Sequence, residues 1–359
     1  MRLALRLARR GYGTTSPNPM VGAVLVKGGK IIGRGWHRQA GNPHAEIEAL
    51  RDAQQRAHNS RGATLYVTLE PCSTHGRTPP CTEAIITAGI KCVVVGATDP
   101  NPKHAGRGLK ILQRAGIQVV CWGGTPSRPD QKAKRSRTDV PAACQKIAQE
   151  CTLLNEAFNH WIIHRRPLVT VKAAMTLDGK IATAGGESKW ITGEKARAFA
   201  MHLRRGSAAI LVGVNTILTD DPSLTVRVPE KIQDSTFNGS PARLRRFVLD
   251  SRARTPLTAK VVSDAHAALT TIVVGRSAPR SRVAALARRV NVLVAPQIKP
   301  ADDRHPLLIN LRWLLRKLGD ENVTSLLVVG GCEVNAYFLL GGLAQRVVLF
   351  YAPKILGGR

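Results

Sequence analysis

Short apolar runs of strand length alternate with segments of helical spacing along most of the chain. Near the N-terminus, two such runs flank a KGGK turn, a pattern typical of a β-hairpin. In this first stretch the predicted strands lie at 21–26, 30–35, 63–69, 91–95 and 117–121, and the predicted helices at 3–10, 45–56, 82–88 and 109–115. This alternation predicts an α/β domain over residues 1–122.

The composition changes after residue 122, where residues 123–144 are rich in Gly, Pro, Ser and basic side chains and are expected to form a linker. A helical pattern at 145–163 predicts a connecting segment over 145–167, and a second alternating pattern fills 168–359. Here the predicted strands lie at 168–175, 208–214, 245–250, 270–275, 291–296, 325–331 and 347–353, and the predicted helices at 194–205 and 307–318. Nearly continuous apolar strands favour a largely parallel sheet with helices on both faces.

The length of 359 residues agrees with two domains, each large enough for its own core. We find no apolar run of about 18 residues, so no membrane span is expected. The basic N-terminal segment MRLALRLARRGYG predicts an amphipathic helix, with a transit peptide as the weaker alternative. Seven cysteines spread over a long chain do not suggest a disulfide framework, and they favour a reducing cytoplasm.

The formal net charge of +29 leaves two interpretations open. It could serve nucleic-acid binding, because Lys and Arg displace counterions from phosphate backbones. It could equally be a solvated basic surface that attracts phosphorylated small molecules. Aromatic residues make up only 4% of the chain and offer few stacking platforms, so we favour the second interpretation and expect no nucleic-acid partner.

Two segments carry the residues expected to perform chemistry, PHAEIEAL at 43–50 and PCSTHGRTPPC at 71–81. Catalytic zinc prefers three imidazole or thiolate ligands and keeps a fourth position open, and His44, Cys72 and Cys81 supply such a set. Glu46 follows the histidine by two residues, as in the H-x-E element of zinc nucleobase deaminases, where the glutamate moves protons and is not a ligand. Either segment alone would be a common pattern, but together they predict a zinc-dependent deaminase site.

Four further residues are candidates for binding the deaminase substrate, and two of them, Arg77 and Asn18, have a plainer alternative. Arg77, in the long loop between the cysteines, suits a phosphate but could be a solvated surface charge. Asn18, in the SPNPMVG turn, could bind a pyrimidine edge or cap the turn. Asp99 and Asn101 follow a predicted strand, where α/β folds bind ligands.

The chain resembles the bifunctional riboflavin-biosynthesis deaminase–reductase family over nearly its whole length. The matching segments are TSPNPMVGAV, PHAEIEAL, VTLEPCSTHGRTPPC, DPNP followed by GRG, VKAAMTLDGKIAT, ESKWITGEKAR, GVNTILTDDPSLTVR and FYAPKILGG. The resemblance implies a cytidine-deaminase-like three-layer domain followed by a dihydrofolate-reductase-like domain. It also implies zinc-dependent deamination of 2,5-diamino-6-(5-phosphoribosylamino)pyrimidin-4-one, a hydrolase activity. A second, oxidoreductase activity would then reduce the ribosyl chain to ribityl with NADPH.

The resemblance also implies roles for individual residues. It makes His44, Cys72 and Cys81 the zinc ligands, Glu46 the proton donor, and Asn18, Arg77, Asp99 and Asn101 contacts of the deaminase substrate. In the second domain, it places Asp178 near the reductase site, Ala174, Trp190, Thr216 and Asp220 near NADPH, and Lys172, Ser188, Arg204, Leu224 and Arg227 near the substrate. Two of these, Arg204 and Arg227, are suited to clamping a ribose phosphate. For Arg204 a surface charge, and for Trp190 core packing, would be the plainer role.

Three features differ from many relatives. Thr74 stands where they carry a histidine, with His75 next, and Val329 precedes Gly330 and Gly331 where they carry a substrate-binding glutamate, while Glu333 follows nearby. The chain also ends at Arg359, soon after the APKILGG segment, so the second domain is expected to lack a terminal strand. These differences leave open a deaminase whose reductase domain is non-functional. By resemblance, homo-oligomers are expected.

Overall fold

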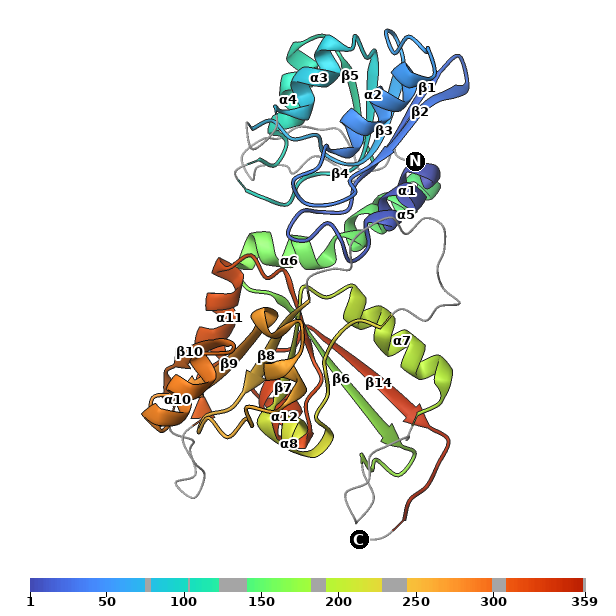
Figure 1. The fold of residues 1–359 in the computed structure, drawn as a ribbon. Coiled ribbons are helices and arrows are strands. Elements are labelled where there is room, and N and C mark those ends of the chain that lie inside the picture. The colour runs from blue at the N-terminus through green and yellow to red at the C-terminus, as the bar shows by residue number, and fades with distance from the viewer. Residues whose placement is uncertain are drawn as a thin grey trace, which may run out of the picture. The chain divides into compact units, whose positions relative to one another are not determined.

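The computed structural model describes residues 1–74, 79–102, 104–122, 141–181, 192–227, 244–298 and 308–357. These residues divide into two compact units, one up to His164 and the other from Arg165 onwards (Figure 1). Among the helices of the described ranges, none combines the length and apolar character needed to cross a bilayer.

The first unit is built on a mixed sheet. Its strands are β1 (Gly22–Lys27), β2 (Lys30–Trp36), β3 (Thr64–Leu69), β4 (Cys92–Ala97) and β5 (Gln118–Cys121). Its helices are α1 (Arg2–Ala8), α2 (Ala45–Gln55), α3 (Cys81–Thr87), α4 (Arg107–Arg114), α5 (Ala142–Leu154) and α6 (Glu156–His164), and a 3-10 turn η1 (Arg9–Gly11) follows α1. In the order β2-β1-β3-β4-β5, β1 is antiparallel to both neighbours, and β3, β4 and β5 are parallel.

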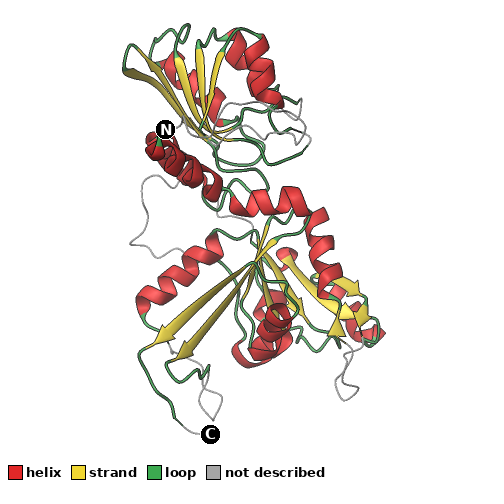
Figure 2. Ribbon diagram, turned by 180° about the vertical axis from the view of Figure 1, so that it is seen from behind, coloured by secondary structure: helices red, strands yellow, loops and turns green. Residues whose placement is uncertain are grey.

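Helices cover both faces of this sheet, which confirms the predicted three-layer domain (Figure 2). One face packs on α2, α3 and α4, through small side chains on α2 such as Ala45 and Ala49, both fully buried. This close packing needs Gly35 on β2, because a Cβ there would lie 2.2 Å from the Ala45 carbonyl oxygen. The other face packs on α1 and α5, where Leu5 and Cys151 are buried.

The single helix predicted at 145–163 is wrong, because the structure breaks it at Asn155 into α5 and α6. Asn155 is buried, and its side chain forms hydrogen bonds with the backbone of Met20. Its Oδ1 accepts a hydrogen bond of 2.7 Å from the backbone N–H of Met20, and its Nδ2 donates one of 2.9 Å to the Met20 carbonyl. The interruption therefore ties this helical pair to the turn that carries Asn18.

The second unit contains a parallel sheet with helices on both faces, as predicted. Its strands are β6 (Leu168–Thr176), β7 (Ala209–Gly213), β8 (Arg245–Leu249), β9 (Thr270–Gly275), β10 (Asn291–Ala295), β13 (Ser325–Val328) and β14 (Arg346–Ala352), with a small pair β11 (Gln297–Ile298) and β12 (Leu308–Ile309). Its helices are α7 (Glu194–Arg205), α8 (Val214–Asp220), α9 (Lys260–Ser263), α10 (Arg280–Ala287), α11 (Leu311–Asp320) and α12 (Cys332–Leu340), with a 3-10 turn η4 (Ala267–Leu269). Within the described residues, the sheet order is β10-β9-β8-β7-β13-β6-β14, and every pairing is parallel.

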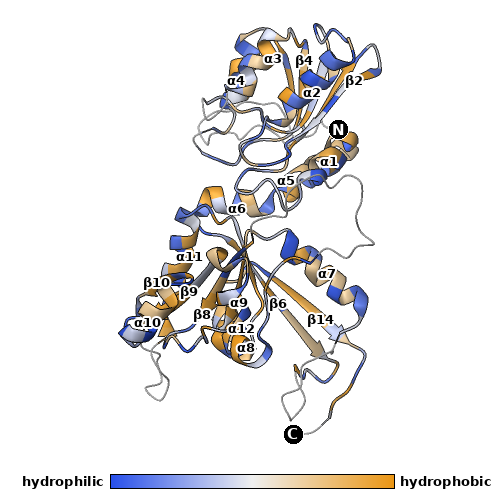
Figure 3. Ribbon diagram, viewed as in Figure 1, coloured by the Kyte–Doolittle hydropathy of each residue, from blue (hydrophilic) through white to orange (hydrophobic). Residues whose placement is uncertain are grey.

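Two cores lie on opposite faces of this sheet. Leu211 of β7 packs in the core that includes α11 and α12, whereas its neighbours Ile210 and Val212 pack in the core that includes α8, α9 and α10. Successive side chains of a strand point to opposite faces, so β7 must be apolar throughout. Figure 3 shows that the helices of this unit carry both hydrophilic and hydrophobic residues.

The predicted helix at 307–318 begins four residues later than expected. Leu308 and Ile309 instead form β12, and α11 begins after Asn310, whose side-chain Oδ1 accepts a hydrogen bond of 3.0 Å from the Trp313 N–H. Asparagine is a favoured N-cap because it satisfies a free N–H group of the first turn. The cap, and not the apolar run, sets the start of the helix.

Candidate metal centre and active sites

The three predicted metal ligands meet at one edge of the first sheet. His44 is the residue immediately before α2, Cys81 is the first residue of α3, and Cys72 follows β3 after Glu70 and Pro71. Their ligand atoms all lie within 4.8 Å of one another, and no other such group occurs among the described residues.

The distances fit a tetrahedral zinc ion. The Nδ1 of His44 lies 3.3 Å from the Sγ of Cys81 and 3.5 Å from the Sγ of Cys72. Zinc–ligand bonds of about 2.3 Å to sulfur and about 2.05 Å to nitrogen, at a tetrahedral angle, place the two ligand atoms about 3.6 Å apart. One imidazole and two thiols also form the donor set that zinc prefers.

The pKa values of the two thiols are shifted in opposite directions. The hydrogen bond from the Cys81 thiol, and a smaller contribution from His44, lower the pKa of Cys72 to about 4, against the opposing effect of burial. The same hydrogen bond and burial raise the pKa of Cys81. The backbone N–H of Cys81 also points at the Cys72 Sγ, 3.3 Å away, so the beginning of α3 favours a thiolate at Cys72.

Glu46 lies in the first turn of α2 and is only 3% exposed. Burial raises the pKa of its carboxyl to about 7, although the charge of His44 opposes the shift. A carboxyl that titrates near neutrality can both accept and return a proton, which suits a general acid–base.

Asn18 is positioned by a residue that the sequence did not single out, His37. The buried His37 ring has its Nδ1 3.1 Å from the carbonyl oxygen of Pro43 and its Nε2 3.1 Å from the Nδ2 of Asn18. A ring that donates from Nδ1 to the carbonyl accepts at Nε2 from the amide, so His37 orients the Asn18 side chain. The His37 ring also stands edge-on to the ring of His44, with centroids 5.3 Å apart. Asn18 is therefore hydrogen-bonded to the ring that packs against the metal ligand His44.

Asp99 is held near the metal ligands by a second unpredicted residue, Glu70. The Oε2 of Glu70 accepts hydrogen bonds from the backbone N–H groups of Asp99 (3.2 Å) and Gly106 (2.9 Å), and its Oε1 accepts one from Gly108 (2.9 Å). The Asp99 carboxylate in turn accepts from the Asn101 N–H at 2.9 Å. Burial raises the pKa of Asp99, and the charge of Cys72 contributes in the same direction.

Gly108 shows how closely these loops approach, since a Cβ there would lie 2.3 Å from the Pro71 carbonyl oxygen. The LEPC segment at 69–72, which ends at the metal ligand Cys72, therefore contacts the loop that carries Asp99 and Asn101. Of the other predicted deaminase residues, Arg77 and the neighbouring His75 lie outside the described residues.

In the second unit, three predicted cationic residues form a cluster. Lys172 is on β6, Arg204 is at the end of α7, and Arg227 follows the loop after α8. Burial lowers the pKa of Arg204 to about 10, and the charge of Arg227 lowers it as well. Burial also lowers the pKa of Lys172, with a further contribution from Arg204. Neighbouring cations that destabilise one another's charge are suited to binding an anion.

Two aromatic rings border the cation cluster. The Lys172 Nζ lies 5.3 Å from the centroid of the Phe350 ring, on β14, and the Phe350 ring packs edge-on against Phe199 of α7. The Phe350 ring therefore makes a cation–π contact with Lys172.

The other predicted residues of the second unit differ in their placement. Ala174 is near the carboxyl end of β6, and Thr216 and Asp220 are on α8, directly after the carboxyl end of β7. In a parallel α/β sheet this edge is where ligands bind. Leu224 is 3% exposed and packs in a core, so only its backbone is placed for a polar contact. Ser188 and Trp190 lie outside the described residues.

Asp178 holds a local turn. Its carboxylate accepts hydrogen bonds of 2.5 Å from the Thr176 hydroxyl and 2.9 Å from the Gly357 N–H, and these lower its pKa.

Val329 packs against the core of α8, α9 and α10, and Glu333 is exposed in the first turn of α12.

Both halves of the chain match known family models. The cytidine and deoxycytidylate deaminase zinc-binding region matches residues 1–97, and the RibD C-terminal domain matches residues 167–359.

Full-length relatives agree with both matches. The riboflavin biosynthesis protein RibD of Aquifex aeolicus is 44% identical over 358 residues, which cover 99% of this chain and 87% of the relative. The Escherichia coli protein of the same name is 39% identical over 360 residues, covering 99% and 88%.

Two solved structures also extend over the chain. Acinetobacter baumannii RibD has a TM-score of 0.78 and 37% identity, covering 99% of this chain and 86% of that one. The diaminohydroxyphosphoribosylaminopyrimidine deaminase/5-amino-6-(5-phosphoribosylamino)uracil reductase of Thermotoga maritima has a TM-score of 0.77 and 35% identity, covering 100% and 87%. The chain therefore belongs to the RibD family, the bifunctional deaminase–reductases of riboflavin biosynthesis, and its zinc site is His44, Cys72 and Cys81.

Proposed function

We propose that the first unit deaminates 2,5-diamino-6-(5-phosphoribosylamino)pyrimidin-4-one and that the second unit reduces the ribosyl chain of the product to ribityl with NADPH. The Thermotoga maritima relative is named for both steps, which supports these substrates. The observation that carries the deaminase half of the proposal is the buried Glu46 carboxyl, which interacts with the His44 imidazole and the Cys72 and Cys81 thiols.

In the deaminase half, His44, Cys72 and Cys81 would hold a zinc ion, which would supply a nucleophile at neutral pH by making water more acidic. Glu46 takes a proton as water adds to the ring carbon that carries the amine, and it returns a proton to the amine, which leaves as ammonia. Asn18 and Asp99 hold the pyrimidine edge, positioned by His37 and Glu70. We assign Arg77 to the phosphate and Asn101 to the substrate, as the sequence suggested.

Exchange of Glu46 for Gln tests the deaminase proposal. The amide keeps the shape but cannot carry the proton, so ammonia release is expected to fall about 10²- to 10⁴-fold while zinc stays bound. Glu48→Gln is the matched control, because Glu48 is on the same helix and pairs with Arg38 and Arg51 at the surface. Full ammonia release by zinc-loaded Glu46→Gln protein would remove Glu46 as the proton carrier.

In the reductase half, bound NADPH would supply the hydride for reduction at the ribosyl C1. The Lys172, Arg204 and Arg227 cluster binds the ribose phosphate, because Lys172 and Arg204 are partly buried and the neighbouring cations repel one another until an anion is present. We assign Ala174, Trp190, Thr216 and Asp220 to the cofactor, and Ser188 and the Leu224 backbone to the substrate. Holding the nicotinamide against the sugar then matters more than a strong acid.

Arg204→Ala tests the assignment of the phosphate site. Removing one cation of the cluster is expected to raise the KM for the phosphorylated substrate at least about tenfold, with little change in the NADPH Kd. Lys195→Ala removes an exposed charge from the same helix and is expected to change neither constant. Equal losses of substrate and NADPH binding in Arg204→Ala would contradict a phosphate-specific role.

The cellular setting is part of the proposal. All seven cysteines are free, which supports a reducing compartment such as the cytoplasm, where the zinc thiolates persist. Homo-oligomerisation is supported by β14, the outermost strand of its sheet among the described residues, where Val347, Leu349 and Tyr351 are 44–57% exposed. Sedimentation of the Leu349→Glu protein as a smaller species than the wild type would support this assignment.

A further inference from the structure

The loop after α8, from Asp221 to Arg227, contains a residue in an unfavourable conformation. Leu224 has a φ of +52°, in the left-handed region that side chains other than glycine rarely adopt. Its side chain is buried in a core, so the backbone conformation cannot relax without unpacking it. Contacts on both sides of Leu224 must therefore hold the loop.

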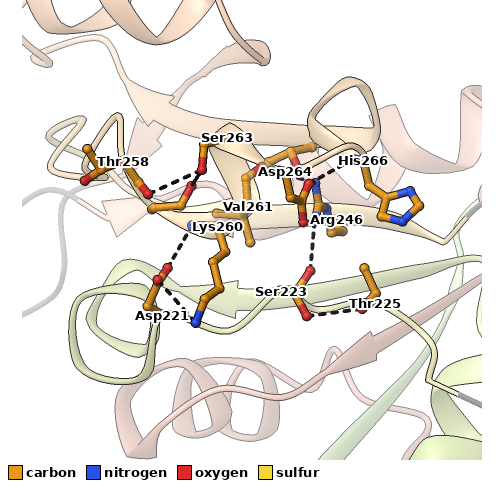
Figure 4. Close-up of polar contacts among 12 residues, drawn as sticks. Asp221, Ser223, Thr225, Arg246, Thr258, Lys260, Val261, Ser263, Asp264 and His266 are labelled. Atoms are coloured by element: carbon orange, nitrogen blue, oxygen red, sulfur yellow. Dashed lines mark hydrogen bonds and ion pairs between the residues drawn. The ribbon is translucent and has the colours of Figure 1, made fainter.

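On one side the loop is bound by Arg246 of β8, whose side chain is 1% exposed (Figure 4). Its Nη1 donates to the Ser223 carbonyl oxygen at 2.8 Å and to Oδ2 of Asp264 at 2.6 Å. Its Nη2 donates to Oδ1 of Asp264 at 2.8 Å and to the Val261 carbonyl oxygen at 3.2 Å. The guanidinium thus joins the loop to a carboxylate and to α9 at the same time.

On the other side the loop is bound by Arg204 of the cation cluster, whose Nη1 donates to the Thr225 carbonyl oxygen at 2.9 Å. The start of the loop is fixed as well, because Asp221 accepts a hydrogen bond of 2.8 Å from the Lys260 backbone N–H. Figure 4 shows the Asp221–Lys260 contact and the Arg246–Asp264 pair anchoring the same loop to α9. Two arginine–carbonyl hydrogen bonds therefore enclose Leu224.

Burying a charged guanidinium is a poor device for stability alone, since its desolvation offsets the attraction of its partner, here Asp264, whose side chain is 23% exposed. The cost is not fully compensated here, because the Nε of Arg246 finds no acceptor within the described residues. An apolar side chain could not donate a hydrogen bond to a carbonyl oxygen at a defined point of the loop. The contacts of Arg246 are thus those of a group that fixes loop geometry.

We infer that Arg246 is a positioning residue for the reductase reaction: by holding the Ser223 carbonyl it keeps the loop in the conformation that presents Leu224 and Arg227 to the substrate and Arg204 to its phosphate. Arg246 itself does not touch the substrate. The inference rests on the proposed reductase function, because it takes the substrate roles of Arg204, Leu224 and Arg227 from it.

The experiment measures reductase kinetics of the full-length chain with 5-amino-6-(5-phosphoribosylamino)uracil and NADPH. Arg246→Lys keeps the charge, but a single ammonium group cannot bond Asp264 through two nitrogens and reach both carbonyls. Asp264→Asn leaves the arginine in place and removes its charged partner. Arg245→Lys is the matched control, because it is the adjacent residue on β8 and pairs at the surface with Glu321 at 2.6 Å.

A positioning role predicts that the KM for the uracil substrate rises about tenfold in Arg246→Lys and also rises in Asp264→Asn, as expected when a buried hydrogen bond is lost. The kcat, the NADPH Kd and ammonia release by the deaminase half stay within about twofold of wild type, and Arg245→Lys is unchanged. Should Arg246→Lys fail to fold, Asp264→Asn decides the question by the same split between KM and kcat.

Two results would overturn the inference while leaving the proposed function intact. The first is an unchanged KM in the folded variants. The second is a lower kcat and weaker NADPH binding that accompany the rise in KM, which would indicate general damage to the domain. A wild-type chain that binds NADPH but reduces nothing would overturn the proposed reductase function, and the role of Arg246 with it.

Discussion

Two of the three zinc ligands lie at the beginnings of helices, and this placement explains much of the chemistry of the site. The N–H groups of a first turn have no partner within the helix and favour negative charge. Cys81 begins α3 and directs its N–H at the Cys72 sulfur, while His44 immediately precedes α2, whose first turn contains Glu46. The metal ligands and the proton carrier are thus held by rigid elements.

Replacement of Cys72 by Ser tests the metal site at the residue scale. Loss of one thiolate is expected to lower zinc occupancy and to reduce ammonia release at least about 10²-fold, while NADPH-dependent reduction continues. Cys92→Ser, on β4, is the matched thiol control and should keep its zinc. Metal analysis of the purified proteins checks the prediction, which fails if Cys72→Ser binds zinc as well as Cys92→Ser does.

The sequence revealed the residues whose chemistry is encoded by short spacings, such as His44 and Glu46. It did not reveal His37 or Glu70, because their roles depend on partners brought close by the fold. His37 bonds Asn18 across 19 positions, and Glu70 bonds Gly106 across 36. A glutamate directly before the ligand segment PC is the one local signal that could have pointed to Glu70.

At the scale of elements, apolar runs identified the strands well, because buried parallel strands are apolar on both faces. Helix boundaries were less predictable. The cap at Asn310 and the break at Asn155 each depend on one amide side chain, and the partner of Asn155 is Met20, 135 positions away. The order of the strands also came only from the structure, since it is set by long-range packing.

Glu70→Gln tests how one element positions another. A glutamine has a single acceptor oxygen, so it cannot accept from Asp99, Gly106 and Gly108 as both carboxylate oxygens do. The loop that carries Asp99 should shift, and the deaminase KM should rise about five- to tenfold, with zinc content unchanged. Glu83→Gln on the exposed side of α3 is the control. A loss of zinc, or an unchanged KM, would argue against a positioning role.

At the scale of the whole molecule, the chain joins two α/β units, and membership of the RibD family confirms the predicted bifunctional enzyme. The high positive charge agrees with a phosphorylated substrate, which both proposed sites would have to bind. The Val329 difference leaves the cation cluster of Lys172, Arg204 and Arg227 intact, so we expect reduction as well as deamination.

The most direct test supplies the zinc-loaded, full-length chain with the diaminopyrimidine phosphate and follows ammonia release and NADPH oxidation together. We predict that ammonia is released in amounts equimolar with substrate whether or not NADPH is present. NADPH oxidation should require the substrate and should follow the release of ammonia. An absence of ammonia release, or NADPH oxidation that precedes it, would contradict the account.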